Sequence, residues 1–204
     1  MQAPEIELKF PVDDPSVLQS LLPALGFHLD TPRTFEQNTL YDTPGRGLRE
    51  QRQLLRLRQY GDVWTLTHKR QPTAAEALGD TRYKIRIETE TRVEDGAAIA
   101  EIVTRLGYGP VFRYEKYRTE WSQPARVGGG LVSGHLVIDE TPIGNYAELE
   151  GPTDWIDATL EQLGINPGQC LTSSYGALFL TWKERTGSPA EHLTFAEIGV
   201  PVLL

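Results

Sequence analysis

The stretch Glu5-Ile6-Glu7-Leu8-Lys9-Phe10 alternates charged and apolar residues without a break. In a β-strand, side chains at positions i, i+2 and i+4 share a face. Glu5, Glu7 and Lys9 therefore project to one side, and the apolar residues project to the other. A strand in any sheet with one solvated face gives the same pattern. The stretch predicts a strand, and its functional meaning depends on how often this pattern recurs along the chain.

Length and composition are those of one generous globular domain. The chain has 204 residues, of which 39% are hydrophobic and 24% are charged. Its net charge of -8 does not favour nucleic acid or an anionic membrane as a partner. No apolar run is long enough for a membrane span or a signal peptide. The single cysteine, Cys170, fits a reducing compartment. We therefore predict a cytoplasmic protein.

The remaining chain alternates between strand and helix patterns. Alternating residues predict strands at 35–41, 53–59, 63–70, 81–93, 111–121, 134–139 and 146–150. Helical spacing predicts helices at about 13–25, 95–106, 154–163 and 173–183. The polar residues 71–80 are predicted to form a loop, and Gly128-Gly129-Gly130 to form a turn. The residues from Gly187 onward give no clear pattern, although residues 193–195 and 200–204 are expected to dock as a short tail.

Charged residues share one face in most of these strands. They are Arg56, Arg58, Lys69, Arg82, Lys84, Arg86, Glu88, Glu90, Lys116, Arg118, Glu120, Asp139, Glu148 and Glu150. The middle strands are mainly basic and the first, seventh and eighth are acidic, whereas a solvated surface intersperses the two signs. About eight antiparallel strands is also a size at which sheets close. We therefore predict an α+β fold: a closed eight-stranded antiparallel barrel with helices packed outside and charges inside.

Such an interior needs counter-ions, because unpaired charges of one sign are costly away from water. Divalent cations would neutralise the carboxylates. Oxygen ligands without a histidine or cysteine cluster favour Mg²⁺ or Mn²⁺ over Zn²⁺. A phosphate chain would neutralise the basic residues, since guanidinium groups bind phosphate with two parallel hydrogen bonds.

The motifs resemble those of the CYTH domain family, the triphosphate tunnel metalloenzymes. Glu5-x-Glu7-x-Lys9 resembles the ExExK signature of that family. The resemblance continues in order through residues 37–43, 55–58, 66–69, 86–90, 115–118, 139–140, 148–150 and 174–175. One departure is Ile87, where the family often has glutamate. The resemblance implies a single tunnel domain over residues 1–185, followed by a tail at 186–204 of uncertain structure.

The resemblance also implies site residues. Metal binding is expected for Glu5, Glu7, Asp139, Glu148 and Glu150. Triphosphate binding is expected for Arg56, Arg58, Lys69, Lys84, Arg86, Lys116 and Arg118. Lys9 would orient or deprotonate the attacking nucleophile, because a lysine among cations can have a lowered pKa. Tyr175 is expected to pack against the barrel mouth as an ordinary amphipathic-helix residue.

The activity implied is Mg²⁺- or Mn²⁺-dependent hydrolysis of inorganic, thiamine or nucleoside triphosphate. One alternative is a class IV adenylyl cyclase, which makes cyclic AMP and pyrophosphate from ATP. A second is a non-catalytic polyphosphate- or nucleotide-binding module. A third is a plain sheet with a solvated charged face. The expected partner is a small triphosphate, with no nucleic acid polymer and no membrane, bound by a monomer or homodimer. No adenine pocket is recognisable in the sequence, so the substrate is not predicted.

Overall fold

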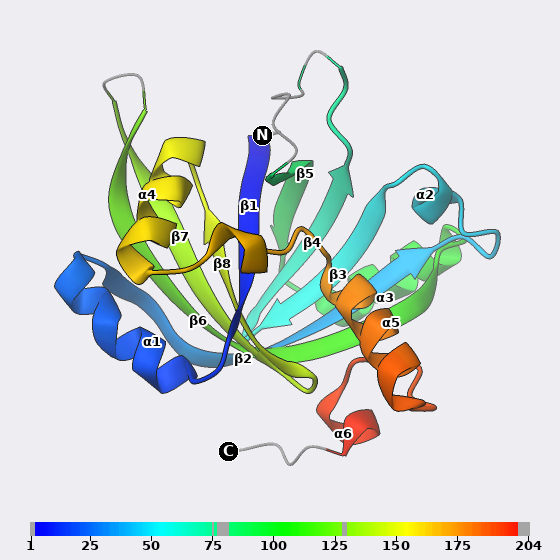
Figure 1. The fold of residues 1–204 in the computed structure, drawn as a ribbon. Coiled ribbons are helices and arrows are strands. Elements are labelled where there is room, and N and C mark those ends of the chain that lie inside the picture. The colour runs from blue at the N-terminus through cyan, green and yellow to red at the C-terminus, as the bar shows by residue number, and fades with distance from the viewer. Residues whose placement is uncertain (1–2, 75, 77–81, 128–129, 200–204) are drawn as a thin grey trace.

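A computed structural model describes residues 3–74, 76, 82–127 and 130–199 (Figure 1). Its strands are β1 (Ala3–Val12), β2 (His28–Asp42), β3 (Leu54–Tyr60), β4 (Val63–Arg70), β5 (Lys84–Val93), β6 (Gly109–Val127), β7 (Gly130–Thr141) and β8 (Gly144–Glu150). Its α-helices are α1 (Pro15–Leu21), α2 (Gly47–Glu50), α3 (Gly96–Arg105), α4 (Thr153–Leu163), α5 (Tyr175–Thr186) and α6 (Phe195–Ile198). Short 3-10 helices lie at Leu22–Leu25 and Pro167–Gln169.

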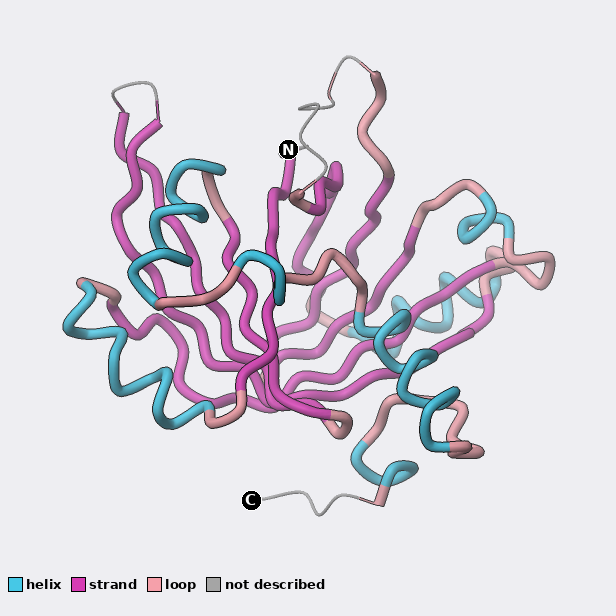
Figure 2. Tube along the Cα trace, in the orientation of Figure 1, coloured by secondary structure: helices cyan, strands magenta, loops and turns pink. Residues whose placement is uncertain are grey.

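The strands close into an antiparallel barrel in the order β1-β5-β4-β3-β2-β6-β7-β8. β1 completes the closure because it pairs with β5 along one edge and with β8 along the other. Glu5 lies opposite Arg86 in the first ladder, and Lys9 lies opposite Glu148 in the second. The predicted closed eight-stranded barrel is therefore confirmed. Figure 2 shows the helices outside the curved wall of strands.

The alternation of the opening stretch places its two faces as predicted. Leu8 and Phe10 are buried in the largest apolar cluster, which also contains Leu18 of α1 and Ile156 of α4. This cluster lies between the outer face of the strands and the helices that cover them. Glu5, Glu7 and Lys9 point into the barrel and line its cavity. The apolar core is thus outside the barrel wall, and the charges are inside.

The first helix begins and ends where the sequence indicates. The Asp14 side chain caps it by accepting a hydrogen bond from the backbone N–H of Ser16 at 2.8 Å. The α-helix stops at Leu21 and continues as a 3-10 turn around Pro23, whose missing N–H cannot extend the α-helical pattern. Gly26 then reverses the chain with a φ of 84°, a conformation that glycine adopts without strain.

Several elements exceed the predicted ranges. β2 begins at His28, β6 ends at Val127 and β7 begins at Gly130, because residues beyond the alternating segments also join the β2–β6 and β6–β7 ladders. The short helix α2 and the 3-10 turn at 167–169 were not predicted. Part of the predicted loop at 71–80, and Gly128 and Gly129 of the predicted turn, lie outside the described residues. Among the residues that the structure describes, no helix is long and apolar enough to cross a membrane.

The C-terminal tail docks on the barrel. Leu193 forms a parallel bridge with Tyr114 of β6, and its backbone N–H donates to the carbonyl of Arg113 at 3.0 Å. Thr194 then caps α6, and the backbone N–H of Phe195 donates to the Glu115 side chain at 3.0 Å. Residues 193–195 therefore dock as predicted, and residues 200–204 lie outside the described residues.

Candidate active site

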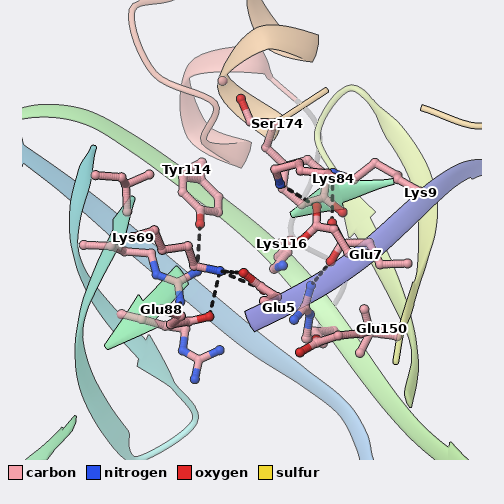
Figure 3. Close-up of a pocket in the computed structure, with 18 of the residues that line it drawn as sticks. Glu5, Glu7, Lys9, Lys69, Lys84, Glu88, Tyr114, Lys116, Glu150 and Ser174 are labelled. Carbon is pink, nitrogen blue, oxygen red and sulfur yellow. Dashed lines mark hydrogen bonds and ion pairs between the residues drawn. The ribbon is translucent and has the colours of Figure 1, made fainter. Parts of the chain in front are cut away.

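A cavity of about 500 Å³ occupies the barrel interior (Figure 3). Charged side chains from β1, β3, β4, β5, β6 and β8 converge on it. The predicted site residues that line it are Glu5, Glu7, Lys9, Arg56, Arg58, Lys69, Lys84, Lys116, Arg118, Glu148 and Glu150. Two predicted residues, Arg86 and Asp139, are not among the residues that line the cavity. The charged residues that share one face in the predicted strands thus line a single cavity.

Most carboxylates of the cavity are paired with cations. Glu5 accepts two hydrogen bonds from Lys69 Nζ, at 2.6 and 2.8 Å. Lys69 also lies 3.1 Å from Glu88, a residue whose place on the charged face the sequence shows but to which no role was given. Glu7 is bonded to Lys84 from the adjacent strand β5. The Glu7–Lys84 and Lys69–Glu88 pairs join neighbouring strands, whereas the Glu5–Lys69 pair reaches from β1 to β4 past β5.

Lys9 is almost fully buried, with 1% of its surface exposed. Its Nζ lies 2.8 Å from Glu148 Oε1 and donates to the backbone carbonyl of Ser173 at 3.0 Å. Burial alone would lower the pKa of Lys9, but Glu148 and Glu7 outweigh it and raise that pKa. The expectation of a lowered pKa is therefore wrong for this arrangement: carboxylates, and not cations, surround the ammonium group, which stays protonated.

Asp139 is the centre of a buried polar cluster behind the cavity wall. It is fully buried and accepts from Lys116 Nζ at 2.9 Å and from Arg118 Nε and Nη2 at 2.7 and 2.6 Å. Tyr175 Oη donates to it as well, at 2.6 Å. Both oxygens of Asp139 are thus already engaged, and the residue fixes two of the cations that face the cavity.

Tyr175 does more than pack at the barrel mouth. It is the first residue of α5, and Ser174 before it caps that helix by accepting from the N–H of Ala177. Lys9 Nζ lies 4.1 Å from the centre of the Tyr175 ring and Lys116 Nζ lies 4.9 Å from it. These are cation–π distances. The helix that closes one side of the cavity is therefore joined to its cations through one aromatic side chain.

Glu36 is a charged residue of the interior that the sequence reasoning missed. It is fully buried and lies 3.4 Å from Lys116 and 4.0 Å from both Arg58 and Arg118. Burial alone would raise its pKa, but Lys116 and Arg118 outweigh it and lower the pKa to about 2. The alternation of Glu36 with Asn38, both buried on the inner face of β2, is the signal that could have found it.

We expect Glu36→Gln to reduce the free energy of unfolding by about 3–5 kcal/mol at pH 7, since it removes the buried negative charge that Lys116, Arg58 and Arg118 face. The folded pKa of Glu36 lies below its usual 4.5, so its stabilising effect is complete above that pH and is lost as the pH falls toward 2. The difference in the free energy of unfolding between wild type and variant should therefore become smaller as the pH falls. Urea unfolding at pH 7, 4.5 and 3 measures it, and a gap independent of pH would contradict the assignment.

Glu150 differs from the other acidic residues of the cavity. It forms no ion pair or hydrogen bond with any residue that the structure describes (Figure 3). Among those residues, no three or more Asp, Glu, His or Cys side chains are arranged to hold a metal ion. Burial, followed by repulsion from Glu5, raises the pKa of Glu150 to about 7. Lys69 and Arg118 lower this pKa, but they offset burial and the repulsion only in part.

The arginines of β3 complete the basic wall. Arg56 donates to Tyr114 Oη at 3.4 Å and lies 3.6 Å from Glu90, and Arg58 lies 3.5 Å from Glu90. Arg86, by contrast, donates to the carbonyl of its neighbour Ile85 at 3.1 Å. The structure thus brings together all of the predicted phosphate-binding residues except Arg86.

Comparison with solved structures finds the same fold in several organisms. A protein described as a putative adenylate cyclase from Vibrio parahaemolyticus aligns with a TM-score of 0.69 at 18% identity, over 86% of this chain and 97% of that one. The PH1819 protein from Pyrococcus horikoshii gives 0.64 at 21% identity, over 87% and 99%. A Hippeastrum protein described as a putative adenylyl cyclase that "reveals a dominant" triphosphatase activity gives 0.55 at 20% identity, over 89% and 96%.

Comparison with curated proteins gives no significant match. The sequence model of the CYTH domain matches residues 3–163, which include all of the barrel strands and the helices between them. The motifs, the closed barrel and the charged interior all lie within these residues. The chain therefore belongs to the CYTH domain family.

Proposed function

We propose that this protein is a metal-dependent enzyme that hydrolyses a triphosphate inside the barrel. The observation that carries the proposal is the cavity itself, a chamber of about 500 Å³ that is lined by Arg, Lys and Glu side chains together. A chain of phosphates complements the first set and divalent cations complement the second. Since Cys170 is the only cysteine, a reducing, cytoplasmic location is part of the proposal.

The carboxylates suit a divalent cation by their chemistry, although among the described residues no three of them are already gathered around one position. Glu150 is held near Glu5 and Glu148 without a cation of its own, and its raised pKa reports that mismatch. A metal ion would remove the repulsion. The donors are carboxylate oxygens, which suit Mg²⁺ or Mn²⁺. We assign Glu5, Glu7, Glu148 and Glu150 to it, where it would supply Lewis-acid neutralisation of phosphate oxygens. Asp139, whose oxygens are engaged, instead positions Lys116 and Arg118.

The basic residues would hold the triphosphate. They are Arg56, Arg58, Lys69, Lys84, Lys116 and Arg118. Arginine binds phosphate oxygens with a planar pair of donors, whereas lysine acts as a point charge. Because these groups are fixed by Glu36, Asp139 and the other carboxylates, they are already oriented toward charge that grows on the phosphate oxygens during transfer. Arg86, which does not line the cavity, is left out of this set.

Lys9 would orient the reacting oxygens. Its protonated amine can donate hydrogen bonds but cannot accept a proton, so we assign it to holding the attacking water or the transferred phosphoryl group. Glu148 and the carbonyl of Ser173 fix its position. Deprotonation of the water is therefore not assigned to this residue.

We prefer hydrolysis to cyclisation as the proposed reaction because of one protein that has the same fold. The Hippeastrum protein carries an adenylyl cyclase name, yet its structure is described as revealing a dominant triphosphatase activity. The barrel found in it and in this chain is therefore compatible with either reaction. Adenylyl cyclase activity remains the second candidate.

Release of phosphate from inorganic, thiamine and adenosine triphosphate tests the proposal directly. We expect turnover with Mg²⁺ or Mn²⁺, and its loss when a chelator removes the metal. Chromatography of the ATP products separates ADP and phosphate from cyclic AMP and pyrophosphate. A folded protein that turns over none of the three substrates with either metal would refute the enzymatic function.

A further inference from the structure

The chain between α4 and α5 crosses β1 and contacts Lys9 (Figure 1). The N–H of Leu171 donates to the carbonyl of Lys9 at 2.7 Å, and the N–H of Lys9 donates to the carbonyl of Leu171 at 3.2 Å. Two residues later, the carbonyl of Ser173 accepts from Lys9 Nζ at 3.0 Å. Tyr175 follows, with its ring centre 4.1 Å from the same Nζ. Residues 171–175 therefore hold both the backbone and the amine of Lys9.

This segment lies after the part of the chain that the family model matches, which ends at residue 163. The barrel strands supply the charged side chains of the cavity. The contacts that residues 171–175 make with Lys9, and the hydrogen bond from Tyr175 to Asp139, come from the chain that follows the barrel. The site is therefore built from the barrel and from a second element that docks on it.

The ring of Tyr175 lies close to two ammonium groups. Its centre is 4.1 Å from Lys9 Nζ and 4.9 Å from Lys116 Nζ, which are cation–π distances. The rings of Tyr114 and Tyr146 support it, with centres 6.1 and 5.9 Å away. An aromatic ring attracts a cation without carrying a net negative charge. The contact therefore fixes the two lysines and leaves their positive charge for phosphate oxygens.

The hydroxyl of Tyr175 has a separate role. Among the described residues, three side chains donate to Asp139, and Tyr175 is the one without a charge. The other two, Lys116 and Arg118, line the cavity, where phosphate oxygens would compete for their hydrogen bonds. Tyr175 would then remain as a donor to the fully buried carboxylate, which is costly to leave unpaired. Burial, followed by the charge of Asp139, raises the pKa of Tyr175 well above its usual value, so the hydroxyl keeps its proton.

Packing does not require this hydroxyl. Tyr175 is 7% exposed and belongs to an apolar cluster with Phe179, in which phenylalanine would fill nearly the same space. We propose that Tyr175 is a positioning residue for the triphosphatase reaction proposed above, on which this inference rests. Its hydroxyl orients Asp139, and its ring holds the ammonium groups of Lys9 and Lys116.

Tyr175→Phe and Tyr175→Leu separate the two contacts. Phenylalanine keeps the ring and loses the hydroxyl. We expect it to lower kcat/KM about 10- to 100-fold, the range that corresponds to one hydrogen bond to a charged group, and to leave the midpoint of urea unfolding unchanged. Calorimetry with a chelator should also show weaker binding of inorganic triphosphate. Leucine loses both contacts and should lower both quantities further. Tyr108→Phe is the matched control and should change nothing, because Tyr108 packs beneath α3 and does not line the cavity.

A residue that only packs gives a different result. Tyr175→Phe would then equal the wild type in turnover and in binding, which would overturn the proposal. A double-mutant cycle adds a second test: Tyr175→Phe combined with Asp139→Asn should lower kcat/KM no more than Asp139→Asn alone, because the hydroxyl acts through that carboxylate. Additive losses would also overturn the proposal. Since calorimetry needs no turnover, a protein that binds triphosphate more weakly in Tyr175→Phe but hydrolyses nothing would keep the positioning role and refute only the proposed reaction.

Discussion

Lys9→Met is expected to lower kcat about 10²–10³-fold, which is the usual effect of removing one donor that stabilises the transition state. Methionine keeps the length of the side chain and removes the charge. Glu148, the partner of Lys9, retains its contact with Arg118 at 2.8 Å, so the variant should fold. The reason for the large effect is burial, because a donor in a chamber with little water contributes far more than one at the surface. Steady-state kinetics with Mg²⁺ measures it.

Lys183→Met is the matched control, since Lys183 lies on α5 over the Phe179 ring and does not line the cavity. The pH profile gives a second readout. The pKa of Lys9 is raised, so no rise in kcat attributable to a neutral lysine should occur between pH 7 and 9. A kcat of Lys9→Met within a few-fold of the wild type would contradict the assignment.

Glu150→Gln should have opposite effects on metal binding and on stability. We expect the affinity for Mn²⁺ to fall at least about 10- to 100-fold, the range seen even for groups behind a metal ligand, and turnover to fall with it. In the chelated protein the same change should raise the free energy of unfolding at pH 8 by about 1–3 kcal/mol. The folded pKa of Glu150 is about 7, above the usual 4.5, so the ionised group costs stability as the pH rises through this window.

Calorimetry with Mn²⁺ and urea unfolding with a chelator measure the two effects separately. Glu101→Gln, on the exposed surface of α3, is the control and should alter neither quantity. A variant that binds Mn²⁺ as the wild type does would exclude Glu150 as a ligand. A chelated variant less stable than the wild type would show that an unrecognised interaction holds this carboxylate.

The alternation of charged and apolar residues, together with the resemblance to the CYTH family, predicted the barrel and most of the residues that line its cavity. Period-two patterns are local, so Glu5, Glu7 and Lys9 were placed on the inner face without knowledge of their partners. What could not be predicted is which side chains meet across the interior. The pKa of Lys9 depends on Glu148, which only the β1–β8 ladder brings to it.

The arrangement of side chains inside the barrel explains the other differences between the predicted and the observed site. Asp139 and Arg86 are on the inner faces that the alternation predicts, yet neither lines the cavity, because strand tilt and neighbouring side chains decide which inward residues reach it. Glu36 was missed although it adjoins the recognised motif at 37–43. The contact of Tyr175 with Asp139 was beyond sequence reasoning, since it depends on where α5 is placed after the barrel has closed.

The pairing of Glu5 with Lys69, of Glu7 with Lys84 and of Glu148 with Lys9 has a thermodynamic consequence. On the proposed function, binding at this site would be an exchange reaction: a phosphate bound by a lysine would release a glutamate, and a metal ion bound by a glutamate would release a lysine. Each ligand therefore prepares the groups that the other needs. By linkage, the triphosphate and the metal must strengthen one another's binding by the same factor.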